Sequence, residues 1–180
     1  GFAPRMQMFV FDITTPNRDG DLDNMIVVHE YGHGVSNRLV GGPANVNALD
    51  ALQSGGMGEG WSDWWGLMFT QKPTDTKMGR YPVGTYVLGQ PPTGSGIRIY
   101  PYSFNMLVDP HTYDDYNISP EVHDTGEIWA SALWDMTWLL IDKYGYSADI
   151  ANGYHPGTPG QDAGNNLALQ LVMDSLKIMP

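Results

Sequence analysis

Two histidines and a glutamate at residues 29–33 form the clearest chemical pattern in this chain. The stretch reads HEYGH, which is an H-E-x-x-H motif. On a helix, His29 and His33 stand one turn apart on the same face, so both rings can bind one zinc ion at about 2.0–2.1 Å. Glu30 points at a different angle and can take the proton from a water acidified by the metal. The motif predicts a zinc hydrolase, and a pair of structural histidines is the alternative.

The identity of the third zinc ligand decides the class of enzyme. A metzincin needs glycine at position 36 and histidine at position 39, but this chain has Ser36 and Leu39. The other common solution is a glutamate on a following helix, and Glu59 in the block GGMGEGWSDWWG suits this role. Asp63 lies one turn further on and could orient a zinc-binding histidine through the far ring nitrogen. A solvated helix-start acid is the alternative for Glu59, and a cap or surface acid is the alternative for Asp63.

His123 and Glu127 form a second pair at helical spacing. They could in principle supply a rival metal site. The preferred role for His123 is a donor that stabilises the oxyanion formed when water attacks a carbonyl group. A helix-start histidine without a role is the alternative for it. His111 and His155 lie in expected loops, where no role is predicted for them.

Helices must position these side chains, and the sequence predicts a mainly helical chain. Met6 to Phe11 reads as a short strand, and a first helix should run from near Asp21 or Asp23 to about Leu39. Gly- and Pro-rich residues 71–117 predict irregular structure with a small hairpin at most. Three further helices are expected, at Glu59–Phe69, Pro120–Lys143 and Asn165–Ile178. Ser119 and Pro120 would form the N-cap and first position of the second of these.

Composition limits the function further. The chain has 180 residues, a number typical of one domain with a real core. A formal net charge of −11 with only 9 lysines and arginines argues against nucleic acid and anionic membranes as partners. No apolar run is long enough to span a bilayer. There are no cysteines, so a transition metal must be bound by histidine, aspartate or glutamate.

Several long blocks carry a family resemblance, and together they cover essentially the whole chain. They read RDGDLDNMIVVHEYGHGVSNRLVGGPAN, GGMGEGWSDWWG, YPYS, EVHDTGEIWASALWDMTWLLIDKYG and GNNLALQLVMDSLK. These blocks resemble the fungalysins, secreted zinc metalloendopeptidases that are distantly similar to thermolysin. The resemblance implies that residues 1–180 form one catalytic domain, the helical C-terminal lobe of a thermolysin-like zinc peptidase, with a short N-terminal strand and long irregular loops.

The resemblance also assigns site residues. It implies His29, His33 and Glu59 as zinc ligands and Glu30 as the catalytic base. It also implies Asp63 as the acid behind a ligand, and His123 as the transition-state histidine. Calcium is a second expected cofactor, because thermolysin relatives use it and the run DGDLD at residues 19–23 resembles part of a calcium loop. Helix capping is the favoured explanation of that run.

Three departures from the thermolysin pattern matter. Residues 34–58 contain no tyrosine to act as a second oxyanion donor, so Tyr100 or Tyr102 is a guess for that role. Ile118 stands where thermolysin has an aspartate that orients its histidine, so Glu121 or Asp115 is expected to orient His123. Finally, comparison with full enzymes of this type leads us to expect that a β-rich N-terminal lobe and the extreme C-terminus are absent from this sequence.

The resulting hypothesis is a secreted zinc endopeptidase that cleaves internal peptide bonds of proteins. A missing N-terminal lobe or a propeptide is an expected partner, and the propeptide would make the protein a zymogen. Two alternatives stay open. One is a zinc-binding structural module, or a part of an enzyme with little activity alone. The other is an exopeptidase of the same zinc class.

Overall fold

A short β-ribbon precedes the first long helix. The structure is a computed structural model that describes residues 5–42, 44–117, 121–151, 155 and 162–180. In it, β1 (Val10–Phe11) pairs antiparallel with β2 (Arg18–Asp19). The strand predicted from Met6 to Phe11 is therefore shorter than expected, because only its end is paired within the described residues. The partner strand β2 was not predicted.

Helix α1 (Asn24–Leu39) carries the H-E-x-x-H motif and begins where the acidic run ends. A 3-10 turn, η1 (Gly20–Leu22), precedes it. Asp23 caps α1 by accepting a hydrogen bond of 3.1 Å from the backbone N–H of Met25. A carboxylate here satisfies a free N–H group and complements the positive end of the helix dipole. Both predicted ends of this helix are confirmed.

Helix α2 (Leu52–Thr70) begins earlier than the predicted start at Glu59. Glycines at positions 55, 56 and 58 argue against a helix there, because glycine has low helix propensity. Tertiary packing overrides that preference. A Cβ added at Gly56 would lie 2.5 Å from the side chain of Thr125, so the glycine lets α2 approach the next helix closely.

Helices α3 (Val122–Tyr144) and α4 (Gly164–Ile178) follow a short 3-10 turn, η2 (113–117). The side chain of Glu121 caps α3, so the predicted start at Pro120 was too early. The proposed Ser119-Pro120 cap lies outside the described residues. Gly145 ends α3 with a φ of 80°, as predicted from its glycine.

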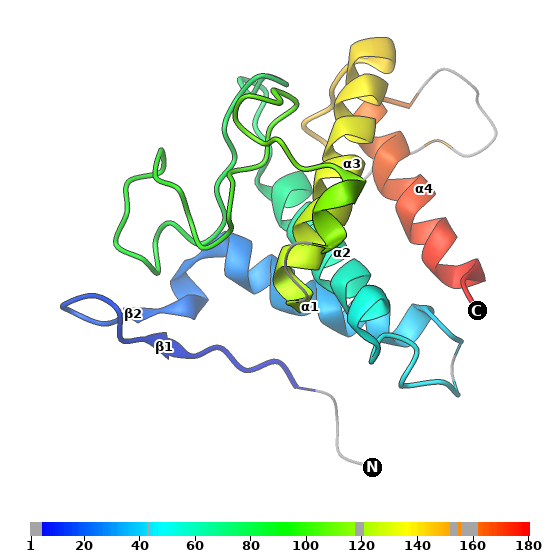
Figure 1. The fold of residues 1–180 in the computed structure, drawn as a ribbon. Coiled ribbons are helices and arrows are strands. Elements are labelled where there is room, and N and C mark those ends of the chain that lie inside the picture. Colours follow the sequence, from blue (N-terminus) through cyan, green and yellow to red (C-terminus); the bar gives the residue numbers. More distant parts are fainter. Residues whose placement is uncertain (1–4, 43, 118–120, 152–154, 156–161) are drawn as a thin grey trace.

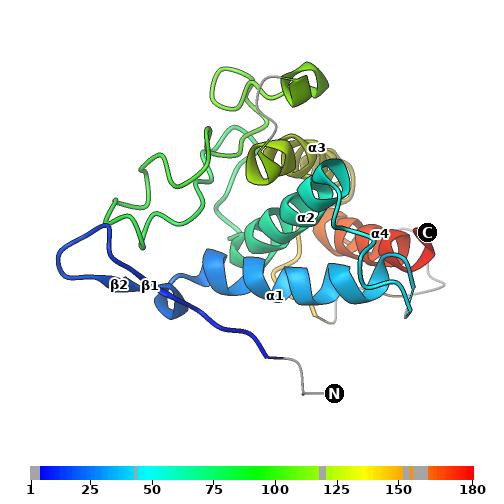
Figure 2. The same cartoon turned by 60° about the horizontal axis from the view of Figure 1, so that its bottom comes forward.

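Helix α2 lies between α1 and α3, and α4 packs mainly against α3 (Figures 1 and 2). Five tryptophans are buried in the core among these helices: Trp61, Trp64, Trp65, Trp134 and Trp138. Residues 71–112 form loops beside α2 and α3 (green in Figure 1), with one bridge between Tyr81 and Tyr102. The predicted mainly helical class is confirmed, and the helices hold the candidate side chains in fixed positions.

Candidate metal centre

The two histidines of the motif project from one face of α1 toward α2. The Nε2 atoms of His29 and His33 are 3.0 Å apart, and their rings meet edge to face. The intervening Gly32 makes this approach possible, because a Cβ at that position would lie 2.8 Å from the ring of Trp65 on α2. The glycine between the histidines therefore lets the motif face the neighbouring helix.

Glu59 of α2 completes a set of three potential ligands. Its Oε2 atom is 3.1 Å from His29 Nε2, and its Oε1 atom is 3.5 Å from His33 Nε2. Within the described residues, this is the one group of three or more such side chains whose ligand atoms all lie within 4.8 Å of one another. Ligand atoms of a tetrahedral zinc site with bonds of about 2.0–2.1 Å are about 3.3 Å apart. The measured separations match that spacing.

The chemistry of Glu59 also fits a cation. Its Oε2 atom is buried and faces the Nε2 atoms of His29 at 3.1 Å and His123 at 3.5 Å. A buried carboxylate is costly unless positive charge or hydrogen-bond donors surround it, and a metal ion bound between Glu59 and the histidines would supply such a charge. Two imidazole nitrogens and one carboxylate oxygen are a known three-residue donor set for catalytic zinc. His29, His33 and Glu59 therefore fit zinc in donor type and in spacing.

The position of Glu59 is fixed from the other side by α3. A Cβ added at Gly126 of α3 would lie only 2.6 Å from the Cβ of Glu59. A larger residue at Gly126 would push Glu59 away from the histidines. Glycines thus bring α1 and α3 against α2 close to the candidate ligands.

Asp63, one turn after Glu59, holds the far side of His29. Its Oδ1 atom is 2.6 Å from His29 Nδ1, which directs Nε2 of the ring toward Glu59. The same carboxylate accepts two hydrogen bonds from Arg98, at 2.6 and 2.9 Å, and one from the hydroxyl of Tyr102 at 2.6 Å. Burial opposes ionisation, but Arg98 and His29 hold the pKa of Asp63 well below its usual range. Asp63 is therefore a fixed anion behind the candidate ligand.

The charges around His29 favour a cation between the candidate ligands. Burial alone would lower the pKa of His29, but the nearby carboxylates of Asp63 and Glu59 raise it to about 9. Burial likewise opposes ionisation of Glu59, but His29 and His33 hold its pKa well below the usual range. A divalent metal competes with protons for the same ring nitrogens. The negative charges that favour the protonated ring therefore also favour a bound metal ion.

Glu30 lies beside the candidate ligands in an accessible position. Its side chain is exposed on α1. Together with His33 it lines a groove of about 770 Å³, which also includes Arg5, Tyr31 and Arg38. A substrate in this groove would lie against both the predicted base and a candidate zinc ligand.

His123 lies at the start of α3, with 47% of its side chain exposed. Its Nε2 atom is 3.5 Å from Oε2 of Glu59, so it faces the candidate metal site. Of the two expected orienting residues, Glu121 is in place, with Oε1 at 2.8 Å from His123 Nδ1. Asp115 instead accepts hydrogen bonds from the backbone and hydroxyl of Thr112.

The two tyrosines suggested as oxyanion donors differ in accessibility. Tyr102 is fully buried and its hydroxyl is bound to Asp63, so it cannot contact a substrate, and that guess is corrected. Tyr100 is 38% exposed, and its ring packs edge to face on His111. Of the two, Tyr100 alone stays a prediction.

Glu127 does not pair with His123 in a rival metal site. Its carboxylate turns to the loop before η2 and accepts the backbone N–H of Ile99 at 3.0 and 3.1 Å. His111, for which no role was predicted, has its side chain buried between two carboxylates. Its Nδ1 atom is 2.8 Å from Asp109, and its Nε2 atom is 3.7 Å from Glu127.

The acidic run before α1 is used for capping. Asp19 accepts a hydrogen bond of 3.0 Å from the backbone of Asp21, and Asp23 caps α1 as described above. No group of three acidic or histidine side chains with metal-ligand spacing occurs there among the residues described. The capping role favoured from the sequence is therefore present, and calcium binding at this run stays a prediction.

The partners of Asp63 were missed by sequence reasoning. Arg98 lies 35 residues after Asp63, in a Gly- and Pro-rich loop without helical or strand periodicity. The sequence offered only the general expectation that a buried acid such as Asp63 needs a cation or hydrogen-bond donors beside it. That expectation could not identify Arg98 as the arginine that binds Asp63.

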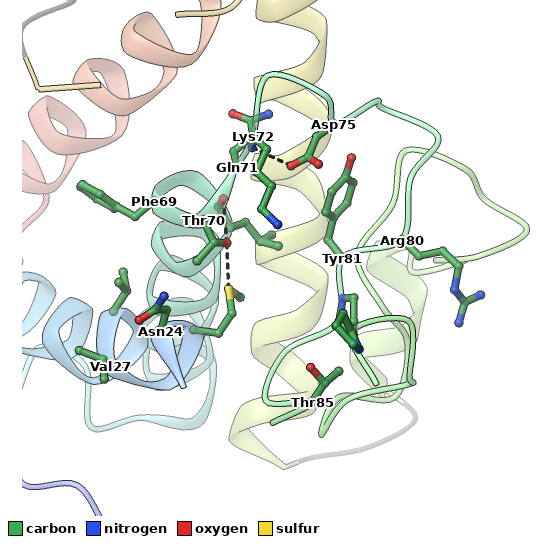
Figure 3. A pocket seen from close by; sticks show the side chains of 15 residues that line it. Asn24, Val27, Phe69, Thr70, Gln71, Lys72, Asp75, Arg80, Tyr81 and Thr85 are labelled. Atoms are coloured by element: carbon green, nitrogen blue, oxygen red, sulfur yellow. Dashed lines mark hydrogen bonds between the residues drawn. The ribbon is translucent and has the colours of Figure 1, made fainter. Parts of the chain in front are cut away.

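A second cavity, of about 620 Å³, lies between the start of α1, the end of α2 and the following loop (Figure 3). Its ionisable lining residues are Lys72, Asp75, Arg80 and Tyr81. It contains no histidine, so it lacks the donor set of the candidate metal centre.

Comparison with known proteins places the chain among metallopeptidases. Extracellular metalloproteinase 2 of Trichophyton tonsurans is 46% identical over 176 residues, which are 98% of this chain and 27% of that protein. Extracellular metalloproteinase 2 of Arthroderma gypseum is 46% identical over 180 residues, 100% of this chain and 28% of that protein. Extracellular metalloproteinase 1 of Phaeosphaeria nodorum is 44% identical over 178 residues, 99% of this chain and 28% of that protein.

The chain thus spans between a quarter and a third of the length of these relatives. The family model described as fungalysin metallopeptidase matches residues 1–180. Both the family match and the relatives agree with the resemblance found in the sequence. The chain belongs to the fungalysin family of metallopeptidases.

Proposed function

We propose that this chain is the zinc-binding catalytic part of an endopeptidase that hydrolyses internal peptide bonds. The observation that carries the proposal is the convergence of His29, His33 and Glu59, whose potential ligand atoms all lie within 4.8 Å of one another. Membership of a metallopeptidase family and the names of the relatives support the same class. The endopeptidase specificity is our inference.

Each side chain of the site has its own role in the proposed reaction. When bound, zinc supplies a Lewis acid that polarises the scissile carbonyl and lowers the pKa of a water. Glu30 takes a proton from the attacking water and passes it to the nitrogen of the leaving amine. His123, oriented by Glu121, donates a hydrogen bond to the oxyanion. Asp63 keeps the proton of His29 on Nδ1, so that Nε2 offers its lone pair to the metal.

We also propose that the β-ribbon packs against a further lobe of the same protein. Four apolar side chains on or beside the ribbon are 46% to 73% exposed: Met6, Phe9, Val10 and Ile13. Clusters of exposed apolar side chains mark surfaces that bind protein. Relatives nearly four times as long leave room for such a lobe. A propeptide is the other candidate for this surface.

Secretion is proposed from the relatives, which are named extracellular metalloproteinases. None of the helices in the described part of the chain is long and apolar enough to cross a membrane.

The first test is the metal content of the purified chain by elemental analysis. We expect one zinc per chain and a strong loss in Glu59→Ala. Glu30→Gln should keep the zinc and lose peptide hydrolysis, because it removes the base without touching a ligand. His155→Gln is a matched control, since this exposed histidine lies beside Asp162. Absence of zinc from the unaltered chain, or full hydrolysis by Glu30→Gln, would refute the proposal.

Two peptide sets separate the remaining alternatives. An endopeptidase cleaves amino-blocked peptides at internal bonds, whereas an aminopeptidase needs the free terminal amine. A structural zinc module would keep its zinc and cleave neither set.

A further inference from the structure

Glu127 of α3 is a buried acid outside the candidate metal centre. Glu127 is only 1% exposed, and its carboxylate accepts hydrogen bonds from backbone N–H groups of a loop without regular structure. Ile99 donates at 3.0 Å to one oxygen and at 3.1 Å to the other, and Tyr100 donates at 3.4 Å. A charged acceptor forms stronger hydrogen bonds than a neutral one, so this carboxylate fixes the loop to the helix.

The loop that Glu127 fixes is the one that holds Asp63. Arg98 directly precedes Ile99, and Tyr102 follows three residues later. Both side chains donate hydrogen bonds to the carboxylate of Asp63. We propose, on the basis of the zinc site proposed above, that Glu127 is a positioning residue for that site. It acts through the peptide flanking Arg98, and so sets the orientation of Asp63 toward His29.

A second anchor ties the same loop to α3. Ser131, one helical turn after Glu127, donates a hydrogen bond of 2.7 Å to Asp109. Asp109 in turn lies 2.8 Å from His111, whose other ring nitrogen is 3.7 Å from Glu127. Both ends of residues 98–111 are therefore attached to one face of α3. The same helix carries His123, so α3 couples the proposed oxyanion donor to the support of a proposed zinc ligand.

The ionised carboxylate is held at a cost to stability. Burial raises the pKa of Glu127 to about 7, although the N–H donors, His111 and Arg98 all lower it. A glutamine would fill the same space without that cost. Residues that lower stability at a fixed structural position are expected where function needs them. This favours a positioning role over a purely structural one.

The test compares Glu127→Gln with Asp135→Asn in the full chain. Asp135 lies two turns along α3 and also has a pKa raised to about 6, by burial and by the charge of Asp109, but it accepts no backbone N–H from residues 98–100 in the hydrogen bonds of the described residues, so it is a matched control. Zinc affinity is measured by competition with a chelator, and ligand geometry by the visible spectrum of the Co²⁺-loaded chain. We expect about tenfold weaker zinc binding in Glu127→Gln, the lower end of the range for residues behind metal ligands. Its Co²⁺ spectrum should change, whereas Asp135→Asn should leave both unchanged.

Two further readouts separate positioning from simple packing. With a chelator present, Glu127→Gln should melt no lower than the parent at about pH 8, because the buried charge is gone. The ratio of parent to Glu127→Gln zinc affinity should be near one at about pH 6 and near ten at about pH 8, since protonated Glu127 resembles glutamine. The charged or titratable groups facing Glu127 are His111, Arg98 and Tyr102.

Equal zinc affinities for the parent and Glu127→Gln would overturn the inference, and so would an equal loss in Asp135→Asn. If Glu127→Gln fails to fold, Ser131→Ala releases the second anchor instead. It should weaken zinc binding by about threefold, which is below the range for residues in direct contact with a ligand. An unchanged affinity in Ser131→Ala would then overturn the inference. Failure of the parent to bind zinc, or unchanged binding in His33→Ala, would instead refute the proposed function.

Discussion

Replacing Asp63 with asparagine should destabilise the chain by about 3–5 kcal/mol, measured without metal, because it leaves the buried charge of Arg98 unpaired. The side chains of Asp63 and Arg98 are only 2% and 7% exposed, so water cannot replace the lost partner. Arg98→Met should cost about as much, since the carboxylate of Asp63 then loses both hydrogen bonds from the guanidinium group. The double variant removes both charges. Its loss should therefore be smaller than the sum of the two single losses by about 2 kcal/mol or more.

Urea denaturation measures the free energy of unfolding of the parent, the two single variants and the double variant. The buffer contains a chelator, because bound metal would add its own binding energy to the stability of the folded state. The exposed pair of Lys77 and Asp142 is a matched control. Nζ of Lys77 and Oδ2 of Asp142 are also 2.6 Å apart, but the two side chains are 40% and 48% exposed. The effects of replacing Lys77 and Asp142 on stability should therefore add without a resolvable coupling energy. If the effects of Asp63→Asn and Arg98→Met add within about 0.5 kcal/mol, the two residues are not coupled and the reasoning is wrong.

Three further predictions concern packing, hydrogen bonding and pH. Gly126→Ala should destabilise the fold by about 1–3 kcal/mol and weaken zinc binding, because its Cβ would displace Glu59; thermal unfolding and chelator competition check both effects. Thr137→Val should cost about 1–3 kcal/mol in urea denaturation, because it removes the acceptor 2.9 Å from the buried indole N–H of Trp64. The raised pKa of Glu127, about 7 against 4.5, gives stability that is full below about pH 4.5 and lost as pH rises through 7. Glu127→Gln should therefore gain up to about 3 kcal/mol relative to the parent between about pH 5 and pH 8, measured by urea denaturation in chelator.

The helical part of the candidate site could be predicted because helical spacing is a local property. His29 and His33 stand one turn apart, and Glu59 and Asp63 repeat that spacing on the next helix, so each pair shares a face. Even so, sequence alone could not measure how close the two pairs lie. That distance depends on Gly32, whose role in packing becomes visible only with the neighbouring helix in place.

The loop part of the site could not be predicted, because it depends on contacts between residues far apart in sequence. Arg98 and Tyr102 lie in a stretch without periodicity, and their shared partner Asp63 is on a helix. His111 illustrates the same limit, since a loop histidine gave no sign that it would be buried between two carboxylates. The early start of α2 was missed for a related reason: its glycines are disfavoured locally but required by close helix packing.

The glycine contacts on both sides of α2 bear on which ion the site can accept. Gly32 of α1 lies against Ser62 and Trp65 of α2, and Gly126 of α3 lies against Glu59 of α2, so the absence of a Cβ lets both helices approach α2 closely. We expect Ca²⁺, with bonds of about 2.3–2.6 Å, to fit the spacing of the proposed ligands less well than zinc, with bonds of about 2.0–2.1 Å. We therefore expect residues that never touch the ion to contribute to the choice of metal at the proposed site.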